Sequence, residues 1–419
     1  MVAAGIRSEF PFFAANQGIT YLDSGATAQK PKSVLDAEIA HYTNCNAPTG
    51  RSLYPLAKDA TEAFDDAREY MAHFFGAQNP TSIVFTSGTT MGANIVAYAF
   101  ARRNLKEGDT VLSTLMEHHA NLVPWQILRD ERGINLQLVN ISEDAILDLS
   151  DLREKLSTGK VRLVCVSHVS NVTATLNPVK EIIELAHKAH AAVLIDGAQS
   201  TGHMPINLSE LGADFFISSG HKMLGPMGTG VLYVHPDRFD EMGVMFGGGD
   251  MISRVTPDEA WFKPMPTRLE AGTQNVAGFI ALAEAAYWLH GFSGGLKGVE
   301  KHIRSIGTYA WEQLAQIPNI KLLGPGPGPN SAMSLVSFTF DHCGCPNRKR
   351  IKDMNLAVKL GEQGICVRSG VFCAQPLVDY HFKLDSAVRA SFHVYNDFHD
   401  VDRLTKTILD IIAEKEKED

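Results

Sequence analysis

The chain has 419 residues, of which 45% are hydrophobic and 20% charged, and its formal net charge is −9. These proportions are those of a globular protein with enough apolar material for a large core, so disorder is excluded as a description of the whole chain. The acidic balance argues against broad binding to a nucleic-acid backbone, and no apolar run approaches the roughly 18 residues of a membrane span. The length favours two or three structural units.

The six cysteines are scattered and form no C-x-x-C pair or zinc-ligand spacing. This pattern excludes a disulfide scaffold and favours a reducing compartment, and the first residues lack the basic and apolar stretches of a signal peptide. We therefore expect a cytoplasmic protein without a metal site. The cysteines are Cys45, Cys165, Cys343, Cys345, Cys366 and Cys373, of which Cys343 and Cys345 are most simply part of a loop.

Short apolar runs alternate with longer amphipathic ones between residues 83 and 234. The apolar runs predict strands that are buried on both faces, and amphipathic stretches such as 178–190 predict the helices between them. This alternation predicts an α/β domain with a mostly parallel sheet, which we place at residues 18–300, and such sheets bind ligands beyond the carboxyl ends of their strands. The predicted strands are 83–86, 110–114, 134–139, 162–167, 192–196, 214–218 and 230–234.

The C-terminal part has a different pattern, in which turn formers at 324–330 separate a helical stretch from alternating apolar runs. We predict a smaller α+β domain here, made of residues 301–419 together with the N-terminal segment 1–17. Its predicted elements are helices at 302–317, 350–362 and 398–417 and strands at 333–340 and 387–395.

The strand predicted at 83–86 runs into a turn that suits an anion. Gly88, Thr89 and Thr90 follow the strand and precede a helical pattern. Free backbone N–H groups and hydroxyls are thereby aimed at one point, which favours an anion site. A plain helix cap with a glycine turn is the alternative, and the spacing of a P-loop is absent.

The strand predicted at 110–114 is followed by two adjacent histidines, His118 and His119, in MEHHANLVPW. Adjacent histidines rarely bind the same metal ion, and no carboxylate lies at a metal-ligand spacing from them. We favour stacking on a planar cofactor, or proton relay, over metal binding.

Two later strand exits carry a carboxylate and a lysine. Asp196 and Gln199 end the run AVLIDGAQ, and a carboxylate there suits the ring nitrogen of pyridoxal phosphate, although a helix cap is the plain alternative. Lys222 follows the next strand, where burial lowers the pKa of its amine and makes it available for covalent attachment. Ser219 and His221 flank it with hydrogen-bond donors suited to a phosphate.

These segments together resemble the class V, fold-type I family of pyridoxal-phosphate enzymes, and most closely its SUF-type (group II) cysteine desulfurases and the related selenocysteine lyases. The resemblance runs from YLDSGATAQKP (21–31) to ASFHVYND (390–397). It implies a large cofactor domain with a mostly parallel sheet and a smaller C-terminal α+β domain. The motifs that carry it are MEHHANLVPW, SHVSNV, IDGAQ, SSGHK, EAGTQN and RSGVFCAQPL, in that order.

The resemblance implies a role for each cofactor residue. Lys222 matches the lysine that holds pyridoxal phosphate covalently, Asp196 the partner of the ring nitrogen and Gln199 the partner of the ring hydroxyl. His118 matches the histidine that stacks on the ring and relays protons. Thr89, Ser219 and His221 match phosphate ligands, Thr90 is grouped with them, and Thr273 matches a phosphate contact supplied by the other subunit of a homodimer.

The resemblance also implies the substrate and the nucleophile. Asn171 and Arg389 match the positions that hold the substrate carboxylate, and Arg368 is grouped with them. Cys373 matches the thiol that takes sulfur from L-cysteine as a persulfide, which leaves L-alanine. The sulfur would pass to an acceptor protein for iron–sulfur cluster or other sulfur-compound assembly.

Some positions depart from the family pattern. The family commonly has two histidines before the nucleophile, and here Val371 and Phe372 replace them. Apolar neighbours disfavour a thiolate, so activation must come from the substrate complex or from Arg368. A selenocysteine lyase, a kynureninase-like hydrolase, an epimerase or an aminotransferase on the same scaffold is the alternative, and a non-catalytic scaffold is the third reading.

Overall fold

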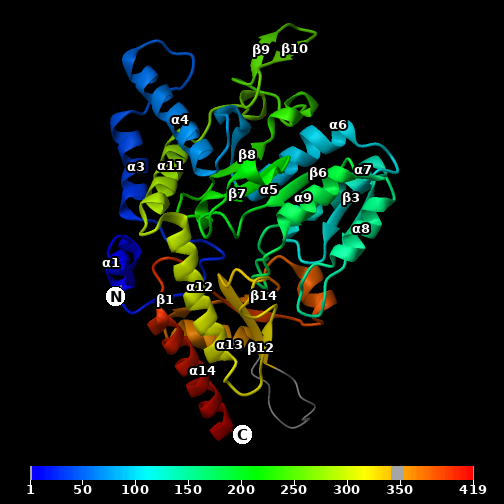
Figure 1. The fold of residues 1–419 in the computed structure, drawn as a ribbon. Helices are drawn as coiled ribbons and strands as arrows, with labels where there is room; N and C mark the ends of the chain where they lie inside the picture. The colour runs from blue at the N-terminus through cyan, green and yellow to red at the C-terminus, as the bar shows by residue number, and fades with distance from the viewer. Residues whose placement is uncertain (1, 341–352, 419) are drawn as a thin grey trace.

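A computed structural model describes residues 2–340 and 353–418 of the chain (Figure 1), so Cys343 and Cys345 lie outside the described residues. The central feature is a seven-stranded sheet in which β8 runs antiparallel to both of its neighbours and the other pairs are parallel. The predicted mostly parallel sheet is confirmed. The strand order is β2 (Ile83–Thr86), β8 (Gly230–Val234), β7 (Phe215–Ser219), β6 (Ala192–Asp196), β5 (Val161–Ser167), β3 (Thr110–Thr114) and β4 (Asn135–Val139).

Both faces of this sheet are covered by apolar side chains. In β6, Val193 and Ile195 pack into one core while Ala192 and Leu194 pack into another, because successive side chains of a strand point to opposite faces. This double burial explains why the strands are continuous apolar runs in the sequence. The helices of this part are α3 (Lys32–Asn44), α4 (Pro55–Phe74), α5 (Thr89–Ile95), α6 (Arg102–Asn104), α7 (Val123–Arg132), α8 (Leu149–Ser157), α9 (Val179–Lys188), α10 (Leu208–Leu211) and α11 (Val276–Gly291).

The C-terminal part contains a second, four-stranded antiparallel sheet, against which helices α12 and α13 pack, and α14 packs against these two helices. Figure 1 shows α12 running from the large sheet to the small one. The predicted boundary at residue 300 falls inside this helix, and the division into domains stays a prediction. The elements are α12 (Gly295–Leu314), β11 (Ile320–Leu323), β12 (Leu335–Phe340), α13 (Asp353–Glu362), β14 (Arg368–Gly370), β15 (Ala387–Ser391) and α14 (Phe398–Glu418).

The N-terminal segment joins the two sheets. Its helices α1 (Val2–Arg7) and α2 (Pro11–Ala15) precede β1 (Thr20–Tyr21), which pairs in parallel with β13 (Ile365–Cys366) beside the small sheet. The chain then continues across to the large sheet, where the Ala28 N–H donates to the carbonyl of His221 at 2.8 Å. The loop between β1 and α3 therefore lies where the two sheets meet.

A hairpin of β9 (Ile252–Val255) and β10 (Ala260–Phe262) projects from the large sheet (Figure 1). Its aromatic side chains Trp261 and Phe262 are exposed. Exposed aromatic groups on a projection are typical of contact surfaces. Among the described helices, none is both long and apolar enough to span a membrane.

Candidate active site

A cavity of roughly 800 Å³, including its open mouth, lies beyond the carboxyl ends of β5, β6 and β7. It is also lined by Gly25 and Phe372, which the sequence did not single out as site residues. Of the site residues predicted from the sequence, Thr273 alone does not line the cavity, and it is exposed. The predicted residues that it brings together are Thr89, Thr90, His118, Asn171, Asp196, Gln199, Ser219, His221, Lys222, Arg368, Cys373 and Arg389.

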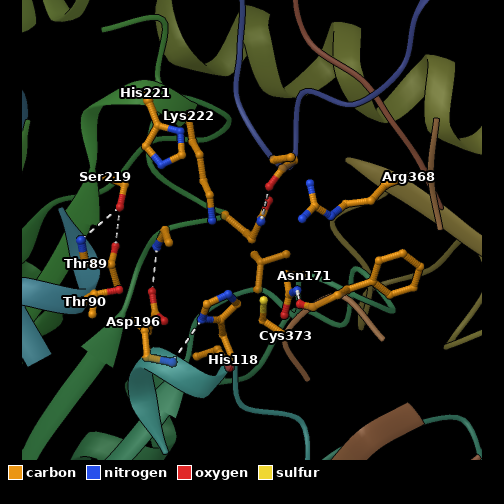
Figure 2. Close-up of a pocket in the computed structure, with 18 of the residues that line it drawn as sticks. Thr89, Thr90, His118, Asn171, Asp196, Ser219, His221, Lys222, Arg368 and Cys373 are labelled. Atoms are coloured by element: carbon orange, nitrogen blue, oxygen red, sulfur yellow. Dashed lines mark hydrogen bonds between the residues drawn. The ribbon is translucent and has the colours of Figure 1, made fainter. Parts of the chain in front are cut away.

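Lys222 ends the short 3₁₀ turn Gly220–Lys222 that follows β7. Figure 2 shows its amine pointing into the cavity. Burial lowers the pKa of Lys222 to about 8, although the carboxylate of Asp196 opposes the effect. This is the direction expected from the sequence. A substantial share of the amine is therefore neutral near pH 8, as a nucleophile or a base must be.

Asp196 is the last residue of β6, and its side chain is buried. One carboxylate oxygen, Oδ1, accepts the Ala198 N–H at 2.9 Å, so the side chain also caps the turn that follows. Burial raises the pKa of Asp196, while the Ala198 N–H and the amine of Lys222 oppose this rise. A buried carboxylate of this kind gains most from a positively charged partner in the cavity.

His118 stands at the start of the 3₁₀ turn His119–Asn121, and its Nδ1 accepts the Ala120 N–H at 3.0 Å. The proton of the neutral ring therefore belongs on Nε2. Burial, and next the charge of Lys222, lower the pKa of His118 to about 3. The ring is thus neutral at physiological pH, which suits stacking on a planar group.

The end of the cavity that is lined by Thr89, Ser219 and His221 carries hydrogen-bond donors suited to an anion. The Thr89 N–H donates to Ser219 Oγ at 2.9 Å, and the two hydroxyl oxygens lie 2.8 Å apart. Burial lowers the pKa of His221 to about 4, so its ring is a neutral donor. Gly88 has φ of 138°, and a Cβ there would lie 3.2 Å from Ser219 Oγ, so glycine keeps this corner open.

Glu117 is a buried residue of the site region that the sequence reasoning missed. Its Oε1 accepts from Thr114 Oγ1 at 2.7 Å and from the Ser167 N–H at 3.1 Å. Its Oε2 accepts from Asn121 Nδ2 at 2.7 Å and from Ser167 Oγ at 2.9 Å. Glu117 thereby joins the ends of β3 and β5 to the turn that carries His118. The one indication in the sequence that Glu117 belongs to the site region was its position directly before His118.

Ionisation of Glu117 should reduce the stability of the protein as the pH rises. Burial raises the pKa of Glu117 from 4.5 to about 7. The folded state therefore holds this proton more tightly than the unfolded state, so the contribution of Glu117 to the free energy of unfolding is present below pH 4.5 and is lost as the pH rises to about 7. The loss is on the order of 3 kcal/mol.

Urea unfolding at pH 5 and pH 8 checks this expectation. The wild-type protein should lose more stability between the two pH values than the Glu117→Gln variant, whose side chain does not ionise. The comparison removes the contributions of all other titrating groups that the two proteins share. The same pH dependence in both proteins would contradict the assignment.

Two guanidinium groups converge at the other end of the cavity. Arg389 is buried on β15, and it donates to the carbonyl of Asn171 at 2.8 Å and to Asp23 Oδ1 at 3.3 Å. Its Nε is buried without a partner among the described residues. Arg368 lies 3.7 Å from the same Asp23 carboxylate. Because one carboxylate serves both arginines, this end keeps a positive charge suited to the carboxylate of a small ligand.

Gly25 permits this arrangement of Arg389. A Cβ at Gly25 would lie 3.2 Å from Arg389 Cζ and 3.2 Å from Ser391 Cβ, tighter than ordinary contact. The carbonyl of Gly25 also accepts from Gln199 Nε2 at 2.9 Å. The loop after β1 therefore brings the guanidinium end and the Gln199 side of the cavity together.

Cys373 lies on the loop after β14, and its thiol is exposed. Figure 2 shows its sulfur directed into the same space as the amine of Lys222. The loop is anchored by the large sheet, because the His119 N–H donates to the carbonyl of Cys373 at 2.7 Å and Asn171 Nδ2 donates to the carbonyl of Phe372 at 2.8 Å. A thiol at this place can reach a molecule held beside Lys222.

The donor set of the cavity fits pyridoxal phosphate. Lys222 would hold it covalently, the buried Asp196 would pair with its ring nitrogen, and the hydroxyls of Thr89 and Ser219 would meet its phosphate. When bound, the cofactor supplies a ring that withdraws electrons from the carbon attached to its amine. Within the described ranges, no group of three or more His, Cys, Asp or Glu side chains could hold a metal ion.

Comparison with known proteins gives consistent matches over nearly the whole chain. The family model described as aminotransferase class-V matches residues 20–404. A probable cysteine desulfurase of Halalkalibacterium halodurans is 39% identical over 93% of this chain and 92% of its own length. The solved cysteine desulfurase CsdA of Escherichia coli is 34% identical, with a TM-score of 0.87 over 98% of both chains. A solved complex of the cystine C–S lyase C-DES with cysteine persulfide is 26% identical, with a TM-score of 0.81 over 96% of this chain and 99% of that one.

Proposed function

The chain belongs to the class-V aminotransferase family and is a pyridoxal-phosphate-dependent cysteine desulfurase, and on this premise we propose that Cys373 is the thiol that takes the sulfur of L-cysteine. The observation that carries the proposal is the exposed Cys373 thiol on a loop anchored beside Lys222 in one cavity. A lyase that simply releases sulfide needs no such thiol.

The proposed roles of the residues follow from their chemistry. Arg389 and Asn171 hold the substrate carboxylate at the positive end of the cavity. Lys222 Nζ, whose pKa of about 8 leaves much of it neutral, moves the proton from the α-carbon. The Cys373 thiolate attacks the substrate sulfur and forms the S–S bond of a persulfide. The carbon–sulfur bond breaks and its electron pair goes to the β-carbon, which takes up a proton from solvent. Return of the α-proton from Lys222 then completes L-alanine.

The proposal extends to the assembly and the destination of the sulfur. We propose that the protein forms a homodimer. Thr273 is exposed and does not line the cavity of its own subunit, and by the family resemblance it matches a phosphate contact that a second subunit supplies. The exposed aromatic hairpin of β9 and β10 would support such a contact. We also include a cytoplasmic acceptor protein that takes the sulfur for iron–sulfur cluster or related assembly, since the persulfide would sit on an exposed loop.

Mass spectrometry after exposure to L-cysteine tests the proposal. The peptide that carries Cys373 should gain one sulfur atom, which a reducing agent then removes. Cys366 in β13 is the matched control within the same sample, because it is also a partly accessible free thiol but does not line the cavity. The Cys373→Ser variant should show no added sulfur on this peptide. Normal release of sulfide by that variant would overturn the persulfide route.

A further inference from the structure

Phe372, directly before the proposed nucleophile, is held by both residues that the proposed function assigns to the substrate carboxylate. Its carbonyl accepts from Asn171 Nδ2 at 2.8 Å. The face of its ring lies 5.2 Å from Arg389 Cζ, a cation–π distance. Phe372 is only 5% exposed, although the adjacent Cys373 is exposed. Phe372 therefore links the carboxylate end of the cavity to the nucleophile loop.

The backbone of this loop is strained. Phe372 and Cys373 have φ of 54° and 55°, in the left-handed region that residues other than glycine rarely adopt. Such a conformation persists only where surrounding contacts impose it. The contacts here are those to Asn171 and Arg389 together with the hydrogen bond from the His119 N–H to the carbonyl of Cys373 at 2.7 Å.

We propose that Phe372 is a positioning residue that holds the nucleophile loop until the carboxylate of an amino-acid ligand engages Asn171 and Arg389. A bound carboxylate neutralises the guanidinium charge that attracts the ring, and it competes for the amide hydrogens of Asn171. Two of the contacts that impose the strained conformation weaken, and the loop that carries Cys373 is released to move. The inference rests on the proposed function, because it uses the carboxylate roles assigned there.

Hydrogen–deuterium exchange of the holoenzyme tests this coupling. The probes are L-alanine, which has the amine and carboxylate but no sulfur, and L-alaninamide, which keeps the amine but lacks the carboxylate. Both are used at concentrations that saturate the change in cofactor absorbance. L-Alanine should speed exchange of residues 371–377 about fivefold, whereas L-alaninamide should leave it unchanged.

Two variants separate the aromatic contact from simple burial. Phe372→Leu keeps an apolar side chain but has no ring face, so its loop should exchange fast without ligand and respond little to L-alanine. Phe372→Tyr keeps the ring and should respond as the wild type does. Slower or unchanged exchange with L-alanine would overturn the inference, as would an equal response to L-alaninamide or a wild-type response of Phe372→Leu.

The failure of this inference is distinguishable from the failure of the proposed function. If Cys373 gains sulfur from L-cysteine but L-alanine does not speed loop exchange, the function stands and the role of Phe372 is wrong. If exchange responds as expected but no persulfide forms, the loop is coupled to the carboxylate site and the persulfide proposal is wrong.

Discussion

Replacing Lys222 with alanine should lower the rate of sulfur removal from L-cysteine by at least about a thousandfold. Lys222 lines the cavity, and burial lowers its pKa to about 8, so we propose that it serves both as the covalent anchor of the cofactor and as a base. Lys222 is the only lysine among the described residues that line the cavity, so no other amine there can replace it and the variant loses both roles. Steady-state assays of alanine and sulfide release at pH 8 measure the loss.

Lys30 provides a matched control for Lys222. Burial also lowers the pKa of Lys30 to about 8, but Lys30 does not line the cavity. After borohydride reduction of the holoenzyme, peptide mass spectrometry should find the cofactor on Lys222 and not on Lys30. A label on Lys30, or a Lys222→Ala variant of normal activity, would disprove the assignment of the anchor.

Replacing Arg389 with alanine should raise the KM for L-cysteine about 100-fold, because a charge-assisted pair between guanidinium and carboxylate is lost. Arg389→Lys should recover part of the affinity, since an ammonium group keeps the charge but cannot pair bidentately. The absorbance spectrum of the bound cofactor should be unchanged in both variants, because Arg389 hydrogen-bonds to Asn171 and Asp23 and not to the residues proposed to hold the cofactor. Arg368, which shares Asp23 with Arg389, lies across the cavity from Asp196, Thr89 and Ser219 (Figure 2).

Arg368 is the control for the substitution of Arg389. Its side chain is 44% exposed, whereas that of Arg389 is 2% exposed, and both share Asp23. Solvent screens an exposed guanidinium, so Arg368→Ala should raise the KM much less. A larger increase in KM from Arg368→Ala than from Arg389→Ala would contradict this assignment and would indicate that Arg368 binds the substrate carboxylate.

The strands of the large sheet and the residues at their ends could be predicted because their signals are local. Strand β6 is a continuous apolar run that ends in Asp196, and β7 is one that leads to Lys222. In a parallel sheet such ends meet at one edge, so the chain order alone brings Asp196 and Lys222 together. The resemblance to a known family then supplied candidates from the other segments.

Glu117 and Phe372 could not be assigned in this way. Glu117 is a single carboxylate beside two histidines, and its four hydrogen bonds come from β3, β5 and the turn after His118. Phe372 stood out only as a replacement of a family histidine, and nothing nearby in the sequence indicates Arg389 as its partner. Both roles depend on contacts between segments that are distant in the chain.

By itself, the sequence therefore determined the mostly parallel sheet and the set of polar residues at its strand ends, because strand burial and strand exits are set by neighbouring residues. Only the tertiary structure decided how Arg389 of β15, Asn171 and the loop before Cys373 contact one another. Those contacts form where two separate sheets pack together. The free energy of that packing is distributed over residues that are distant in the sequence, and a local hydrophobic pattern does not indicate which of them meet.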